Sequence, residues 1–169
     1  HNETAALVQG EAKSEMWYVL DAEPGAFVYA GVKPGVDWDR LLRAMEGGRV
    51  DEVLKKIEVK ANDAIYIPGG CVHAIGAGCL MLEVQQNSNT TYRIYDWNRK
   101  DVDGRARALH RDEARSVADV LYEGEKSLWR KVKEESGYLW WSIIASPDFQ
   151  VQRLDIRGSW NVEKNLDSF

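Results

Sequence analysis

Apolar residues gather along this chain in short runs, which are separated by polar stretches and by Gly, Pro and Asn. The runs over 14–20 (SEMWYVL) and 26–32 (AFVYAGV) have the composition of strands and lie on either side of the sequence EPG at 23–25, so they predict a hairpin. Residues 63–97 continue in strand-like runs, interrupted by PGG, GAG and NSN. Many short strands with turn residues between them predict a mainly β fold, a sandwich or a barrel.

Helical periodicity interrupts the strands at two places in the middle of the chain. The spacing of apolar residues predicts a helix over 37–48, with Asp37 as its N-cap and Gly47 at its end, and a second short helix over 49–59. A further helix is expected over 108–122, and strand character resumes near residue 138. A short helix is also expected over residues 2–9.

Composition narrows the classes of partner. The chain has 169 residues and a formal net charge of −5, which argues against a broad nucleic-acid-binding face and against an anionic membrane. No stretch approaches the roughly 18 apolar residues of a membrane span. Cys71 and Cys79 flank a turn, so a disulfide is possible, but free thiols in a cytoplasmic protein are the preferred interpretation. The chain opens on His1 without an initiator Met, and we expect it to be an excerpt of a longer protein.

Two charged residues share one face of the first strand. Side chains alternate across a strand, so Lys13 and Glu15 lie on the same side as Trp17. This face is either an outward polar surface or the mouth of a barrel, where the carboxylate could hold a metal ion and the ammonium could meet an anion. The pattern alone leaves both interpretations open.

His73 follows the PGG turn, between apolar residues, in the sequence IPGGCVHAIGAG. A histidine in such a place is either a hydrogen-bonded core residue or a metal ligand at a barrel rim. Arg93, in TTYRIYDW, is either an outward charge or a partner for an anion. Glu83 belongs to a polar group, LEVQQN, that a plain structural strand does not need, and this group is either part of a site or a structural hydrogen-bond network. His110 is interpreted as part of a solvated helix face.

Three stretches together resemble the class I mannose-6-phosphate isomerases, in their short bacterial form. They are AKSEMWYVLDAEPGA, DAIYIPGGCVHAIGAG and LEVQQNSNTTYRIYDWNR, and their order and separation also fit that family. The resemblance implies a cupin jelly-roll barrel with one zinc ion per subunit. It further implies a helical insertion near 37–58 and the opening strands of a second cupin-like barrel. The implied division of the chain is a metal-binding domain over 1–118, a connection over 119–137 and a second domain over 138–169.

The resemblance also assigns roles to residues. It implies that Glu15 and His73 are metal ligands, that Arg93 is catalytic, and that Lys13 and Glu83 are further catalytic candidates. Lys13 and Arg93 are also expected to bind substrate. The family takes further ligands from a Gln-x-His-Pro motif that this sequence does not contain, so the remaining ligands are expected upstream of His1.

The implied function is interconversion of mannose 6-phosphate and fructose 6-phosphate through an enediol, with a small sugar phosphate as partner and a monomer in the cytoplasm. The alternative is a non-catalytic cupin module that binds sugars or regulates another protein, because a fold does not determine a function. A third expectation concerns the chain by itself: without its missing ligand segment it is inactive, whatever the activity of the full-length protein.

Overall fold

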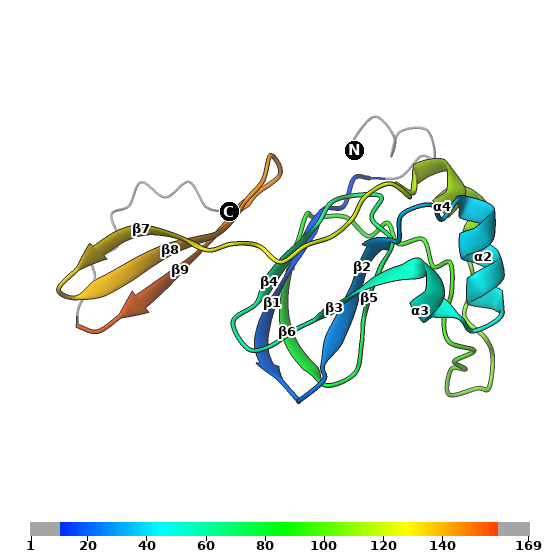
Figure 1. The fold of residues 1–169 in the computed structure, drawn as a ribbon, viewed down its shortest axis with the longest axis horizontal. Helices are drawn as coiled ribbons and strands as arrows, with labels where there is room; N and C mark the ends of the chain where they lie inside the picture. The colour runs from blue at the N-terminus through cyan, green and yellow to red at the C-terminus, as the bar shows by residue number, and fades with distance from the viewer. Residues whose placement is uncertain (1–10, 159–169) are drawn as a thin grey trace. The chain divides into compact units, whose positions relative to one another are not determined.

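The computed structural model describes residues 11–158, and the helix expected over 2–9 lies outside this range. The chain divides into two compact units, residues 1–126 and 127–169, and each is described here by itself. Figure 1 shows strands in both units and helices in the first. The prediction of a mainly β fold is confirmed.

Two antiparallel three-stranded sheets form the first unit. The first sheet has the order β4-β1-β6 and the second has the order β3-β2-β5. Their strands, in chain order, are β1 (Glu15–Ala22), β2 (Phe27–Val32), β3 (Leu54–Glu58), β4 (Ala64–Ile67), β5 (His73–Ile75) and β6 (Cys79–Gln85).

The main core lies between these two sheets. Trp17 and Val19 of β1 and Ile65 of β4 pack with Val28 and Ala30 of β2, and none of the five is more than 1% exposed. These residues occupy alternate positions along their strands, as the pleat of a sheet requires. These positions are therefore the ones that the two sheets turn toward each other.

The other face of β2 is covered by helices (Figure 1). They are α2 (Trp38–Glu46), α3 (Val50–Val53) and α4 (Arg111–Val117). Asp37 caps α2 as predicted, because its side chain accepts a hydrogen bond from the backbone N–H of Arg40 at 2.7 Å, and Gly47 follows the last turn. This second core joins Tyr29 and Val32 of β2 to the apolar faces of the helices.

The predicted hairpin over 14–32 is wrong in its pairing. Both strands and the turn exist, but β1 pairs with β4 and β6, while β2 pairs with β3 and β5. The turn after β1 crosses from one sheet to the other, so the two strands face each other across the core. Strand-like composition indicates an extended segment, and it carries no information about which strand lies beside it.

The predicted helix over 49–59 is correct for only one turn. After α3, the chain becomes extended at Leu54 and forms β3, which pairs with β2 in the register Ile57 to Val28. Residues 54–58 alternate between more and less buried positions, and Leu54 and Ile57 pack against apolar cores. Tertiary pairing with β2 overrides the helical propensity of this segment.

Two further predictions need correction. The helix expected over 108–122 spans only Arg111–Val117, and Asp119 ends it by accepting backbone N–H groups of Leu121 and Tyr122 in an Asx-type turn. The strand character expected for residues 90–97 is also wrong, because this segment forms no strand. Its backbone and side chains instead make hydrogen bonds with residues 107–110, described below.

The second unit contains one antiparallel sheet in the described part of the chain, with the order β7-β8-β9. Its strands are β7 (Arg130–Glu135), β8 (Tyr138–Ala145) and β9 (Gln150–Ile156). The strand β7 lies within the segment 119–137 that was expected to be a connection. None of the helices found in residues 11–158 has the length and apolar character needed to cross a bilayer.

Candidate active site

A cavity of about 400 Å³ opens in the first unit, between the start of β1, the PGG turn, residues 90–97 and the helices. The five residues singled out in the sequence all line it: Lys13, Glu15, His73, Glu83 and Arg93. Apolar side chains of α2, α3 and α4 line the rest of its wall. Charged groups and an apolar wall together are typical of small-molecule sites.

Glu15 is one of the few charged residues that the described part of the chain buries, at 5% exposure. It is the first residue of β1, and the Nζ atom of Lys13 lies 3.0 Å from its Oε1 atom. A carboxylate removed from water in this way needs a cation or hydrogen-bond donors close by, because burying an unpaired charge is costly. Lys13 and Glu15 therefore face the cavity, and the outward interpretation does not apply.

The PGG turn brings His73 from the other sheet to this carboxylate. The chain leaves β4 at Ile67, turns through a hydrogen bond from the Cys71 N–H to the Pro68 carbonyl (3.0 Å), and enters β5 at His73. Gly70 has φ +92°, and a Cβ atom there would lie 2.6 Å from the carbonyl oxygen of Val117. Only glycine fits this position, both for its backbone angle and for lack of space.

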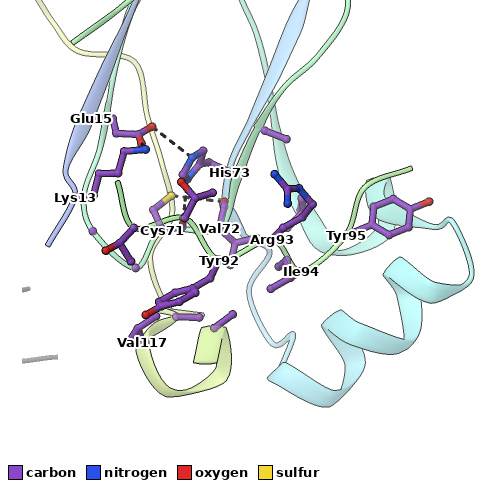
Figure 2. Close-up of a pocket in the computed structure, with 18 of the residues that line it drawn as sticks. Lys13, Glu15, Cys71, Val72, His73, Tyr92, Arg93, Ile94, Tyr95 and Val117 are labelled. Carbon is purple, nitrogen blue, oxygen red and sulfur yellow. Dashed lines mark hydrogen bonds and ion pairs between the residues drawn. The ribbon is translucent and has the colours of Figure 1, made fainter. Parts of the chain in front are cut away.

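The imidazole of His73 faces Glu15 (Figure 2). Its Nε2 atom lies 3.5 Å from Oε2 of Glu15, and its Nδ1 atom lies 2.8 Å from the carbonyl oxygen of Cys71. The ring also packs edge-on against Trp17, with 5.4 Å between ring centroids. These contacts hold the ring in one orientation.

The donor set fits part of a metal site. A carbonyl oxygen can only accept a hydrogen bond, so Nδ1 of His73 is the donor in its contact with Cys71, and Nε2 is the ring nitrogen that faces Glu15. An imidazole nitrogen and a carboxylate oxygen 3.5 Å apart are two donor atoms of the kinds that bind zinc. Metal-binding histidines commonly donate their other N–H to a carbonyl in this way. Within residues 11–158 no group of three such ligands occurs, so the pair is a partial set.

Glu83 lies on β6 opposite Trp17 of β1, on the same cavity wall. The indole N–H of Trp17 donates a hydrogen bond to its Oε2 atom at 3.0 Å. Since Trp17 is 1% exposed, this contact fixes one end of an otherwise exposed carboxylate. Trp17 therefore touches both Glu83 and His73, and it links the two sides of the site.

Arg93 is held by a segment that was expected to have no role. The backbone N–H of Arg93 donates to Nδ1 of His110 at 3.1 Å, and the N–H of His110 donates to the Arg93 carbonyl at 2.8 Å. The Nη1 atom of Arg93 donates to the carbonyl of Ala108 at 3.3 Å. His110 thus takes part in a reciprocal pair with Arg93, which a freely solvated helix face would not form.

Asp96 is the second carboxylate buried beside the cavity, at 8% exposure. The guanidinium of Arg107 donates to both of its oxygens, and the Nε atom of Arg93 lies 4.0 Å away. The hydrogen bond from Arg107, aided by the positive charge of Arg107, Arg93 and Arg99, lowers the pKa of Asp96 below its usual value. The carboxylate therefore stays ionised and anchors this segment.

Sequence reasoning missed His110 and Asp96. Asp96 stands three residues after Arg93. An acidic residue so close to a candidate anion-binding arginine was the signal that could have indicated its role. His110 had no comparable signal, because its partner lies 17 residues earlier and no periodic pattern connects them. Cys71 and Cys79 are both free, with Cys71 buried, so the preference for thiols over a disulfide agrees with the structure.

Comparison with known proteins gives the site its context. The chain is 37% identical to mannose-6-phosphate isomerase of Streptococcus mutans over 97% of its own length and 52% of that relative. It is 36% identical to mannose-6-phosphate isomerase ManA of Bacillus subtilis, over 90% of this chain and 48% of that protein. The chain is related to the mannose-6-phosphate isomerases. The resemblance inferred from its motifs is confirmed.

The fold agrees with this relationship. The crystal structure of mannose 6-phosphate isomerase from Bacillus subtilis matches with a TM-score of 0.82 and 29% identity, over 92% of this chain and 49% of that one. The cupin architecture expected from the resemblance is confirmed. No model of a known protein family matches the chain. The chain spans about half the length of the curated relatives it matches.

Proposed function

We propose that the protein interconverts mannose 6-phosphate and fructose 6-phosphate. The observation that supports this is the cavity itself: a chain related to mannose-6-phosphate isomerases has a buried carboxylate, an imidazole and two cationic side chains at one cavity. Its volume of about 400 Å³ lies within the usual range for small-ligand pockets.

The reaction moves a proton between C2 and C1 of the sugar while the carbonyl moves in the opposite direction. In the aldose-to-ketose direction a base removes the proton from C2, an enediol forms, and a proton is returned to C1. Negative charge develops on the oxygen of the original carbonyl during the first step, and a fixed cation near that oxygen lowers the barrier. The net change is an isomerisation, so no oxidant or reductant is consumed.

Zinc is the metal that we propose for the site. Glu15 and His73 would hold it, together with ligands from outside the described residues. Bound zinc would supply Lewis acidity toward a carbonyl oxygen. Cys71 supports the arrangement indirectly, because its carbonyl fixes the ring nitrogen that His73 presents.

Arg93 is the residue that we propose for charge stabilisation at the reacting end of the sugar. Its guanidinium is always protonated, and its backbone is fixed through His110. Lys13 would share the task of binding the anionic substrate, and Lys13 and Glu83 are the two candidates for the base that takes the C2 proton. Trp17 binds one oxygen of Glu83, which leaves the other oxygen available for such a role.

The test is Arg93→Ala in the full-length protein, with conversion of mannose 6-phosphate measured alongside zinc content. We expect kcat/KM to fall about 10²- to 10³-fold while zinc is retained, because a charge-stabilising donor acts on the transition state. Unchanged turnover with retained zinc would remove Arg93 from its role. If the unsubstituted full-length protein binds sugars without converting them, the non-catalytic module is the better description.

A further inference from the structure

A tight turn next to Arg93 places a bulky residue where the backbone disfavours it. The N–H of Arg99 donates to the carbonyl of Asp96 at 2.9 Å and closes a four-residue turn. Its two central residues, Trp97 and Asn98, have φ of +50° and +55°. Positive φ at both central positions is the pattern of a type I′ turn, which normally contains Asn, Asp or Gly.

Asn98 suits this turn and Trp97 does not. Within residues 11–158, three non-glycine residues have positive φ: Trp97 and the two asparagines Asn62 and Asn98. The short polar side chain of Asn tolerates the left-handed region, whereas a bulky residue there is an outlier. A tryptophan at this position therefore costs stability that Asn or Gly would not.

The protein covers the ring of Trp97 only in part. Trp97 remains 42% exposed, although it is among the largest apolar side chains of the protein. Its ring contacts Tyr95, with 5.1 Å between centroids, and the guanidinium of Arg99 lies 5.5 Å from the ring centroid. Trp97 also lines the cavity that Glu15 and His73 line. Strained residues beside a cavity commonly have a functional reason for being there.

The segment that leads into Trp97 is anchored at two residues. Asp96, the residue before Trp97, is 8% exposed and is fixed by Arg107. Arg93, three residues earlier, is tied to His110. A large side chain at the end of such an anchored segment is pre-positioned for a ligand, which reduces the ordering cost of binding.

We propose that Trp97 is a substrate-binding residue whose indole ring forms an apolar wall of the cavity for the sugar ring. The face of a hexose that presents C–H groups is apolar and matches an aromatic surface, while its hydroxyl and phosphate groups need the polar and cationic side chains. This proposal rests on the proposed function, because it takes the sugar phosphate as its ligand. It makes Trp97 a determinant of affinity for the sugar, separate from the groups that would carry out proton transfer.

The experiment uses Trp97→Gly and Trp97→Asn in the full-length protein, with Asn98→Gly as the matched control. Both substitutions at Trp97 relieve the backbone conflict and remove the ring, whereas Asn98→Gly changes the same turn and keeps the ring. We expect the Trp97 variants to unfold at an equal or higher temperature than the unsubstituted protein. We expect their KM for mannose 6-phosphate to rise about ten-fold with a smaller change in kcat, and Trp97→Phe to recover part of the loss. The control should keep the original KM.

A Trp97 variant with an unchanged KM would overturn the proposal, whether or not its stability changes. If such a variant were also less stable, Trp97 would have a packing role instead. Binding of mannose 6-phosphate by isothermal titration calorimetry separates this failure from that of the proposed function. If the unsubstituted protein binds the sugar phosphate but does not isomerise it, weaker binding by the Trp97 variants still supports the role of Trp97. If the unsubstituted protein neither binds nor isomerises it, both proposals fail.

Discussion

His73 is hydrogen-bonded to the carbonyl of Cys71, two residues before it, through Nδ1 at 2.8 Å. This contact determines which ring nitrogen faces Glu15, because the carbonyl requires a proton on Nδ1 and leaves Nε2 free to act as a ligand. Cys71 ends the turn that carries the chain from one sheet to the other, and His73 begins the strand β5 that follows it. The orientation of the candidate ligand is therefore built into the crossing between sheets.

Metal binding by the full-length protein should depend on both residues of this pair. We expect Glu15→Gln and His73→Ala each to weaken zinc binding by at least about ten-fold, because each removes one donor from a small ligand set. Zinc content after dialysis against a weak chelator measures the effect. Glu83→Gln is the matched control, since Glu83 lines the same cavity but accepts its hydrogen bond from Trp17. Native zinc content in Glu15→Gln would contradict the assignment of this ligand.

The turn itself should be sensitive to a single methyl group. Gly70→Ala adds a Cβ atom 2.6 Å from the Val117 carbonyl at a residue with φ +92°, so we expect a loss of about 3 kcal/mol in the free energy of unfolding. Gly25→Ala is the control, because Gly25 has φ +82° but nothing within 4 Å of the added atom, and it should cost about 1 kcal/mol. Urea denaturation measures both. Equal losses in the free energy of unfolding would show that the backbone at Val117 moves away from the added methyl group without a measurable cost.

Local patterns in the sequence predicted the parts of the fold that depend on neighbouring residues. The helix α2 has the expected cap at Asp37 and the expected stop at Gly47, since both signals lie within one turn of the helix they limit. The existence of β1 and β2 was also predictable, because both runs are rich in the aromatic and β-branched residues that favour strands. The position of His73 at the start of a strand followed from the PGG turn before it.

Features that depend on distant residues could not be predicted in this way. The partners of β1 lie about 50 to 70 residues later in the chain, and the composition of β1 would suit a hairpin equally well. Leu54 ends a helical turn and begins a strand because β2 is available beside it. Arg93 lies in an irregular segment because residues 107–110 supply its hydrogen-bond partners. For the candidate ligands, the resemblance of whole motifs supplied what single residues could not.

The ion pair of Asp96 and Arg107 should make stability depend on pH in the acid range. The folded protein lowers the pKa of Asp96, so the pair contributes stability fully above the pKa of an unfolded aspartate, about 4, and loses it as the pH falls through the lower folded value. Arg107→Met should therefore be less stable than the unsubstituted protein at pH 7, and the difference should shrink below pH 4. Urea midpoints at pH 7, 5, 4 and 3 measure this trend.

Arg115→Met is the control for that series, because the ion pair of Arg115 with Asp39 is exposed on both sides, at 62% and 59%. Exposed pairs contribute little, so this variant should differ from the unsubstituted protein less than Arg107→Met does at neutral pH. If the difference in urea midpoint between Arg107→Met and the unsubstituted protein stayed constant from pH 7 to pH 3, the ion pair with Asp96 would not be its cause.

Cys71, whose carbonyl orients His73, should resist alkylation as long as the protein is folded. It is 7% exposed, and burial raises the pKa of its thiol to about 12. At pH 8 only about one thiol in 10⁴ is then ionised, and the thiolate is the reactive form. We expect iodoacetamide to label Cys71 only after denaturation, as measured by mass spectrometry of the peptide that contains it. Cys79→Ser is the matched variant, since it removes the more accessible neighbouring thiol and should leave the protection of Cys71 unchanged. Rapid labelling of Cys71 in the folded variant would show that the turn opens readily and that the orientation of His73 is not fixed by it.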